Sequence, residues 1–240
     1  IENLFDWALE QGADIISCSW GATAVSYPLS TRQRAAINRA ATEGRNGKGC
    51  VIVFAAGNTN RPINGTVNEA GWPDNVLRGP TTWLNGFANH PDVIAVSACT
   101  SLGEKSAYSN WGNSISVCAP SNNVPPDVFL PQTGYVFAPP PIRKMLRGLG
   151  MVTSDRLGTK GYSPSDYTDS FGGTSSACPL VAGVAGLMLS VNPNLTAKAV
   201  KELLQRSADK IVDNEPDPQF GNTYGTYDTN GHSLWFGYGK

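Results

Sequence analysis

FGGTSSACPLVAG, residues 171–183, joins a glycine-led turn to a run of small apolar residues. Gly172 and Gly173 permit backbone conformations that residues with side chains rarely adopt. The sequence therefore predicts a turn that places Ser175 at the start of a helix over about Ser175–Leu189. Backbone N–H groups without partners and the helix dipole favour negative charge at such a helix start, and the oxyanion of acyl transfer carries such a charge. Capping of the helix is the simpler role for a serine here.

Two more segments end an apolar run on small or polar residues. Val51–Phe54 is followed by Ala-Ala-Gly-Asn, which ends at Asn58, and Asp14–Cys18 is followed by Ser-Trp-Gly, residues 19–21. Asn58 can donate a hydrogen bond from its amide, although asparagine after a strand is commonly a turn residue. Trp20 can fill a core. Taken singly, neither segment indicates a function.

Together and in this order, the three segments resemble the motifs of the subtilases, the subtilisin-like and kexin-like serine peptidases. The resemblance implies that Ser175 is the nucleophile and that Asn58 donates to the oxyanion. Ser176 stands where the family usually has methionine, which removes a common site of oxidation. The expected activity is that of a serine endopeptidase that forms an acyl-enzyme on Ser175, with no cofactor required for the chemistry.

The same resemblance implies a substrate cleft. Ser19, Trp20 and Gly21 are expected to line it, because an extended peptide can pair with backbone groups of such a strand end. Gly86 is expected at the floor of the first specificity pocket, within a residue or two. The kexin-like branch usually adds acidic residues after this strand, but residues 22–42 contain no Asp or Glu. A dibasic preference is therefore not supported.

Apolar periodicity predicts helices that alternate with strands along the chain. Such alternation predicts a three-layer α/β sandwich, with a mainly parallel central sheet and helices on both faces, as in subtilisin-like proteins. Tyr162–Ser170 is a poor strand candidate. The predicted helices lie at Glu2–Glu10, after a cap at Ser30 or Thr31, and at Ala197–Ser207, and the predicted strands lie at Asp14–Cys18, Val51–Phe54, Val93–Cys99 and Ile115–Cys118.

Composition fits one partial peptidase domain over residues 1–240, with a net charge of −1. The small basic cluster at residues 143–147 predicts no nucleic-acid partner, and no apolar run is expected to reach the roughly 18 residues that span a membrane. Residues 59–84 and 121–149 are rich in Pro, Gly and Asn. We expect surface insertions there; they either shape substrate access or have no role.

The five cysteines, Cys18, Cys50, Cys99, Cys118 and Cys178, match no zinc or redox spacing. We expect mainly free thiols, which leave an intracellular location open, whereas the resemblance implies a secreted or periplasmic protein. Many subtilases also bind structural calcium. Thr100 replaces a strand-end aspartate that the family sometimes uses, so this sequence does not support calcium binding.

The other two members of a catalytic triad are not found in the expected place. Subtilases run Asp, His, Ser along the chain, and the twelve residues before Ala13 contain no histidine. The resemblance therefore implies that this sequence is about the C-terminal two-thirds of a subtilase domain, without the closing C-terminal helix. A polypeptide substrate and a complementary N-terminal segment that carries Asp and His are the expected partners. Alone, the chain should be nearly inert.

Two other hypotheses stay open. The chain can be a pseudoenzyme or peptide-binding module that keeps the cleft without the base. It can also be an α/β-hydrolase, whose order Ser, Asp, His would be met by Ser175, Asp213 or Asp228, and His232. That hypothesis needs a strand immediately before Ser175 and His232 within hydrogen-bond reach of the hydroxyl.

Overall fold

The computed structural model describes residues 1–22 and 25–240. Its central sheet has four strands, all parallel, in the order β1-β3-β6-β7. Every residue of β3 and β6 is buried, as expected for parallel strands covered on both faces. The four strands are β1 (Ile15–Cys18), β3 (Val51–Ala55), β6 (Val93–Cys99) and β7 (Ile115–Pro120).

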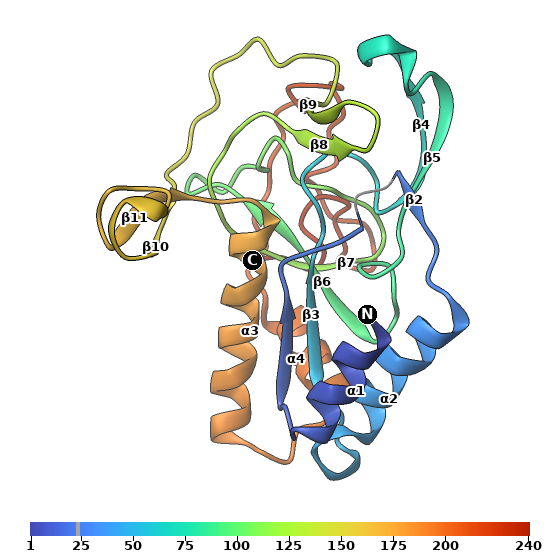
Figure 1. Cartoon of the computed structure of the whole chain (residues 1–240), viewed down its shortest axis with the longest axis vertical. Coiled ribbons are helices and arrows are strands. Elements are labelled where there is room, and N and C mark those ends of the chain that lie inside the picture. The colour runs from blue at the N-terminus through green and yellow to red at the C-terminus, as the bar shows by residue number, and fades with distance from the viewer. Residues whose placement is uncertain (23–24) are drawn as a thin grey trace.

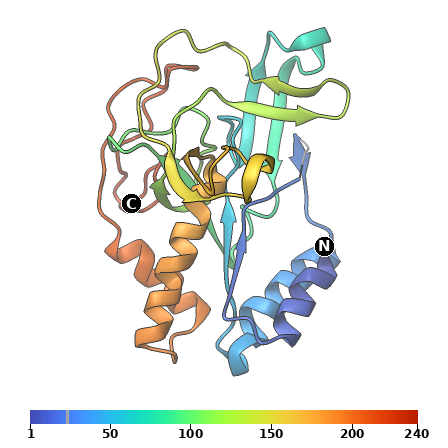
Figure 2. The same ribbon diagram turned by 60° about the vertical axis from the view of Figure 1, so that its left-hand side comes forward.

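Two layers of helices cover the sheet (Figures 1 and 2). α1 (Glu2–Glu10) and α2 (Thr31–Gly47) pack on one face, and α3 (Thr174–Val191) and α4 (Ala197–Ser207) pack on the other. Strand alternation explains the division, because Ile52 and Phe54 join the α1–α2 core whereas Val51 and Val53 join the α3–α4 core. The predicted three-layer sandwich is confirmed.

Local signals set most boundaries where the sequence places them. Ser30 is the N-cap of α2: its hydroxyl accepts from Gln33 N at 3.1 Å, and the Gln33 side chain accepts from Ser30 N at 2.9 Å. The prediction for Tyr162–Ser170 is wrong, because β11 (Tyr167–Phe171) is a strand. It lies outside the central sheet and pairs only with β10 (Met151–Ser154). Cross-strand pairing in that hairpin overrides the weak local pattern.

α3 also corrects an expectation about apolar length. With 18 residues, this helix is long and apolar enough to cross a membrane by length and composition alone. Its inner face, which includes Ala177, Cys178 and Ala185, is fully buried against the central sheet. Small residues on that face let the helix pack closely on the strands.

Hairpins surround the carboxyl ends of the central strands. β4 (Asn64–Glu69) and β5 (Gly79–Asn85) are antiparallel, with the short helix η1 (Pro73–Asn75) between them, and β2 (Ser26–Tyr27) adds to β5. β8 (Asp127–Leu130) pairs with β9 (Gly134–Phe137). The short helix η2 (Gly158–Lys160) joins β10 to β11. Figure 1 shows β4, β5, β8 and β9 at the end of the molecule where α3 begins.

Candidate active site

The three segments meet at the carboxyl-terminal ends of the central strands. Ser19 follows β1, Asn58 follows β3, and Ser175 lies in the first turn of α3. The Ser19 hydroxyl donates to the carbonyl of Ser175 at 2.8 Å, and the Ser175 hydroxyl lies 3.4 Å from the carbonyl of Ser19. Parallel strands place their carboxyl ends at the same edge, which brings residues far apart in sequence together.

Asn58 is fixed by the residue before Ser175. Its Oδ1 accepts from the backbone N–H and from the hydroxyl of Thr174, both at 2.8 Å. Thr174 Oγ1 in turn accepts from Gly57 N at 3.0 Å. Because Oδ1 is held in this way, the amide Nδ2 points elsewhere, and it donates no hydrogen bond to the described residues.

Two glycines permit this arrangement. Gly173, the N-cap of α3, has φ of 80°, and a Cβ on it would meet Asn58 Nδ2 at 3.1 Å. Gly57 has φ of 108°, and a Cβ there would lie 2.5 Å from the amide of Asn110. Both values lie in the left-handed region that favours glycine. The turn predicted before Ser175 therefore has a steric cause.

Two hydrogen-bond donors near Ser175 remain free among the described residues. One is Nδ2 of Asn58 and the other is the backbone N–H of Ser175, which has no acceptor there. Such a pair, at a helix N-terminus, can stabilise an oxyanion that forms on a substrate carbonyl. The nearby Cys178 thiol is fully buried, and burial raises its pKa, so it does not compete as a nucleophile.

These groups line one cleft with a volume of about 260 Å³. Ser19, Trp20, Gly21, Asn58 and Ser175 all border it. Further parts of the wall come from the β2–β5–β4 sheet and from the β8–β9 hairpin: Tyr27, Trp83, Leu84, Asn85, Asp127, Val128, Phe129 and Tyr135. The cleft is open enough for an extended peptide to lie beside Ser175.

Trp20 takes both of the roles considered for it. Its ring packs edge-on against Phe54 and Phe87, with centroids 5.1 Å away in each case, and it also lines the cleft. Gly86 is buried behind the wall rather than among the lining residues, which include its neighbours Leu84 and Asn85. A Cβ on Gly86 would collide with the carbonyl of Tyr27, so the glycine permits β2 to pack close to this wall.

Both histidines lie at the opposite, amino-terminal ends of the central strands. His232 Nε2 lies 2.8 Å from the carbonyl of Ile115, the first residue of β7, and His90 lies just before β6. Asp228 accepts from the backbone N–H of His232, not from its ring. Asp213 accepts from the backbone N–H groups of Lys105 and Glu215. The triad required by the α/β-hydrolase hypothesis is therefore not assembled among the described residues.

Comparison with known proteins now identifies the family. The model of the subtilase family, Peptidase_S8, matches residues 1–225. The chain belongs to the subtilase family. A protein named calcium-dependent protease from Trichormus variabilis is 39% identical over 98% of this chain, which spans 32% of that relative. An extracellular protease of Xanthomonas campestris is 32% identical over 82% of this chain, corresponding to 24% of that protein.

Solved structures agree on the fold of this subtilase. The serine protease of Aeromonas sobria, solved in complex with the chaperone ORF2, matches 100% of the chain and 44% of its own length, with a TM-score of 0.64 and 20% identity. MycP1 without its N-terminal propeptide matches 99% of the chain and 62% of its own length, with a TM-score of 0.59 and 22% identity. These likenesses support the subtilisin-like architecture.

A buried ionic cluster that no local sequence pattern indicates supports one wall of the subtilase cleft. Glu69, at the end of β4, accepts from Arg61 Nε at 2.6 Å and Nη2 at 2.8 Å. It also accepts from the indole N–H groups of Trp72 and Trp83, each at 2.7 Å. Burial alone would raise the pKa of Glu69, but these hydrogen bonds and the charge of Arg61 hold it below its ordinary value of 4.5.

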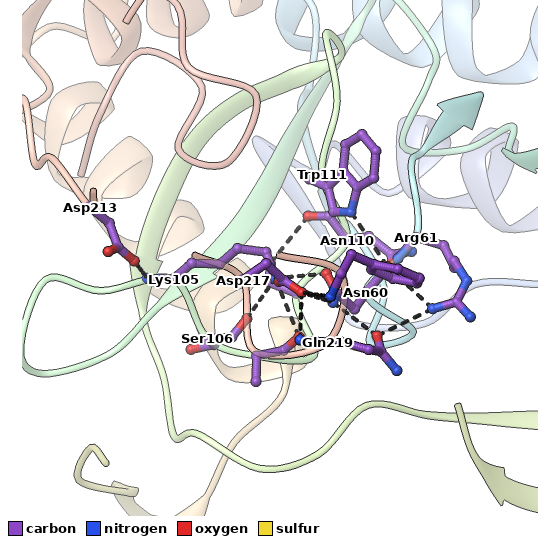
Figure 3. A network of polar contacts seen from close by, with 12 residues as sticks. Asn60, Arg61, Lys105, Ser106, Asn110, Trp111, Asp213, Asp217 and Gln219 are labelled. Carbon is purple, nitrogen blue, oxygen red and sulfur yellow. Dashed lines mark hydrogen bonds and ion pairs between the residues drawn. The ribbon is translucent and has the colours of Figure 1, made fainter. Parts of the chain in front are cut away.

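The same cluster continues to the C-terminal segment (Figure 3). Lys105 Nζ donates to Asn60 Oδ1 at 2.8 Å and to Asp217 Oδ2 at 3.2 Å. Asn60 Nδ2 reaches both Asp217 oxygens at 3.1 Å, and Gln219 Oε1 at 2.9 Å. Because Asn60 follows Asn58 by two residues, the cluster also anchors the loop that carries the free amide donor. We name these residues the Glu69 cluster: Asn60, Arg61, Glu69, Trp72, Trp83, Lys105, Asp217 and Gln219.

Asn110 completes the support of that loop. Its Oδ1 accepts from the backbone N–H groups of Thr59 and Arg61 at 3.0 and 3.1 Å, and its Nδ2 donates to the carbonyl of Ala56 at 3.0 Å. One side chain therefore contacts the loop on both sides of Asn58. A loop held in this way can keep a hydrogen-bond donor aimed at a reacting carbonyl without reorganisation.

Proposed function

We propose that this chain supplies the nucleophile, the oxyanion donors and the substrate cleft of a serine endopeptidase. The observation that carries the proposal is the meeting of the Ser175 hydroxyl with two free donors, Asn58 Nδ2 and the Ser175 backbone N–H, in one open cleft. Such donors are worth most when they already point to where charge develops. The family supports a protease.

The chemistry follows the acyl-enzyme route. Ser175 Oγ attacks the carbonyl carbon of a peptide bond, and its proton passes to a general base. The carbonyl oxygen becomes an anion that the two free donors stabilise. Collapse of this intermediate breaks the C–N bond, and the amine leaves with the proton returned by the base. Water then attacks the ester in the same manner and releases the acid.

The general base is the part that the described residues do not supply. Among them, the only hydrogen bond of the Ser175 hydroxyl is with the Ser19 carbonyl, which is not a base for this proton transfer. The chain also spans about a third of the length of the curated relatives named calcium-dependent protease. We therefore propose that a complementary N-terminal segment carries the catalytic His and Asp.

The surface beside the cleft fits such a segment. β1 is an edge strand, paired only with β3, so its other side presents backbone groups to a further strand. α3, which packs on β1 and β3, exposes an apolar stripe of Leu180, Val184, Leu187 and Val191, with Leu187 68% exposed and Val191 86% exposed. The spacing of four, three and four residues keeps the stripe on one face.

The occupant that we propose adds a strand to β1 and lays an apolar helix on the α3 stripe. It would then approach Ser175 from the side opposite Asn58, since β3 lies on the other side of β1. Exposed Leu4 and Trp7 of α1, at 41% and 62%, offer apolar surface on the other face of the same edge. An open strand edge flanked on both faces by apolar side chains is typical of an incomplete layer.

Location and metal binding are the remaining parts of the proposal. One relative is named an extracellular protease, which favours secretion, and all five cysteines are buried without disulfides in the described structure. Two relatives are named calcium-dependent protease. The described residues hold no group of three or more His, Cys, Asp or Glu side chains that could bind a metal, and Thr100 Oγ1 accepts from Leu102 and Glu104 N–H groups. No step of the proposed chemistry depends on calcium.

The proposal is tested by restoring the base. The chain is combined with the complementary segment, expressed as one polypeptide, and treated with a fluorescent fluorophosphonate, which labels activated serines. We expect labelling of Ser175, and cleavage of an unfolded protein substrate, in this assembled protein. The chain by itself should label at least about 10³-fold more slowly, because the base is missing.

Matched variants give this test its controls. Ser175→Ala must lose the label, whereas Ser176→Ala must keep it. Val184→Asp with Leu187→Asp on the α3 stripe should prevent assembly when the segment is supplied in trans. Assembly without labelling or cleavage would instead support the peptide-binding module.

A further inference from the structure

One carboxylate in the cleft has no partner. Asp127 is the first residue of β8, and its backbone N–H donates to the carbonyl of Asn58 at 3.1 Å. Its side chain lines the cleft that contains Ser175. Among the described residues, no hydrogen bond or ion pair reaches this carboxylate. Residues 23 and 24 are Thr and Ala, so they carry no charge to neutralise it.

Asp127 is also the one charged side chain among the described residues that border the cleft. Four aromatic side chains line the same cleft: Tyr27, Trp83, Phe129 and Tyr135. Phe129 and Tyr135 meet edge to face, with centroids 5.2 Å apart, on the hairpin that carries Asp127. Aromatic rings accommodate the aliphatic stem and the charge of a lysine or arginine side chain.

Other acidic groups close to the cleft are already used. Glu69 accepts four hydrogen bonds and is 3% exposed, and Asp217 is paired with Lys105. A substrate cation cannot reach them without breaking the Glu69 cluster. Asp127 differs because its side chain is exposed to solvent. Partial burial raises the pKa of Asp127, and a cation bound beside the carboxylate would lower that pKa again.

We propose that Asp127 makes the cleft select peptides with a lysine or arginine side chain close to the scissile bond. The inference rests on the proposed peptidase function and names its substrate class. Closeness to the scissile bond follows from the direct contact between Asp127 N–H and the Asn58 carbonyl, since Asn58 carries a proposed oxyanion donor. A charge-assisted hydrogen bond to the ammonium or guanidinium supplies the selectivity.

This inference concerns one basic side chain, whereas the sequence expectation was that a dibasic preference is not supported. That expectation considered acidic residues only in the segment just after Ser19-Trp20-Gly21. In the structure the carboxylate comes instead from β8, more than a hundred residues further along the chain. The β8–β9 hairpin lines the cleft and brings to it an acidic group that no local sequence motif predicts.

The experiment measures peptide binding to the assembled protein with Ser175→Ala, which holds peptides without turnover. Fluorescent peptides of one length carry a single lysine, or its uncharged analogue norleucine, at successive positions. At one position we expect the lysine peptide to bind about tenfold more tightly. Asp127→Asn should reduce that ratio to about twofold or less. Asp169→Asn removes an exposed charge outside the cleft and should leave the ratio unchanged.

Three results would overturn the inference. They are equal binding of both peptides at every position, a lysine preference that survives Asp127→Asn, and failure of any peptide to bind. Fluorophosphonate labelling of the parent protein separates this inference from the proposed function. Labelling without charge preference removes the inference alone, and charge preference without labelling removes the peptidase function alone.

Discussion

The Glu69 cluster and the cleft around Ser175 are connected by one short loop, Asn58–Arg61, yet they treat polar groups in opposite ways. In the cluster, the Arg61 guanidinium is fully buried and donates to Glu69, Gln219 and backbone carbonyls. In the cleft, Asn58 Nδ2, the Ser175 N–H and the Asp127 carboxylate have no such partners among the described residues. Satisfied groups hold the structure, and groups left free are available to a substrate.

The largest effect should come from the hydroxyl on the cleft side. Ser175→Ala removes the nucleophile, and in the assembled protein turnover of a peptide substrate should fall by about 10⁶-fold, as for a nucleophile acting within a triad. Steady-state hydrolysis measures this loss. Urea unfolding should be unchanged within about 0.5 kcal/mol, because the exposed hydroxyl makes one weak contact, at 3.4 Å. Retained turnover would show that another group is the nucleophile.

On the cluster side, breaking the ion pair should cost stability. Arg61→Met leaves Glu69 buried without its cation, and we expect the free energy of unfolding of the assembled protein to drop by about 3–5 kcal/mol. Urea denaturation followed by tryptophan fluorescence measures it. The matched control is Arg39→Met, which breaks an ion pair with Asp6 whose side chains are 40% and 34% exposed. It should cost about 1 kcal/mol or less; equal losses would contradict the buried pair's special role.

The free amide offers a third way to test the contrast. Asn58→Ala should lower turnover by about 10²–10³-fold, the magnitude measured for such a donor in subtilisin, a relative. KM should change little, because the donor acts on charge that forms in the transition state. Asn58→Asp keeps an oxygen for Thr174 N–H while removing the donor, so it separates positioning from donation. An Asp variant as active as the parent would exclude the proposed donor role.

Lowering the pH should reduce the stability that the Glu69 cluster provides. The donors in the cleft, Asn58 Nδ2 and the Ser175 N–H, do not titrate. Burial opposes ionisation of Glu69 and Asp217, yet hydrogen bonds and the charges of Arg61 and Lys105 hold both pKa values below their ordinary values of 4.5 and 3.8. The unfolded chain therefore binds more protons, so this stability is present above about pH 4.5 and is lost as pH falls through the folded pKa values. Urea midpoints from pH 7 to pH 3 should decline accordingly. Glu69→Gln should flatten that decline, and an unchanged decline would contradict the assignment.

The sequence predicted the parts of the fold that follow from local pattern. The bounds of α1, α4 and β6 follow from apolar periodicity, and the turn before Ser175 follows from Gly172 and Gly173. Ser19, Asn58 and Ser175 could be related before the structure because their three segments together resemble the motifs of the subtilases. These residues meet because the strands of a parallel sheet all have their carboxyl-terminal ends on the same side.

The remaining features depend on contacts between segments without periodicity. Arg61, Glu69 and Asp217 look like ordinary surface charges in the sequence, and their burial depends on two hairpins and the C-terminal segment packing together. Asp127 follows Pro125-Pro126 in a stretch that reads as a loop. Gly86 was expected in the pocket floor, whereas its neighbours Leu84 and Asn85 line the cleft. Local sequence patterns do not determine whether a residue near the cleft lines it or is buried behind the lining residues.

The open side of β1 has a further consequence for handling this chain. A strand with free backbone groups and apolar flanks can pair with other extended segments, including the same strand of a second copy. Concentrated preparations of the isolated chain should therefore self-associate through β1. The proposed complementary segment should prevent this association by covering β1, in addition to supplying catalytic groups.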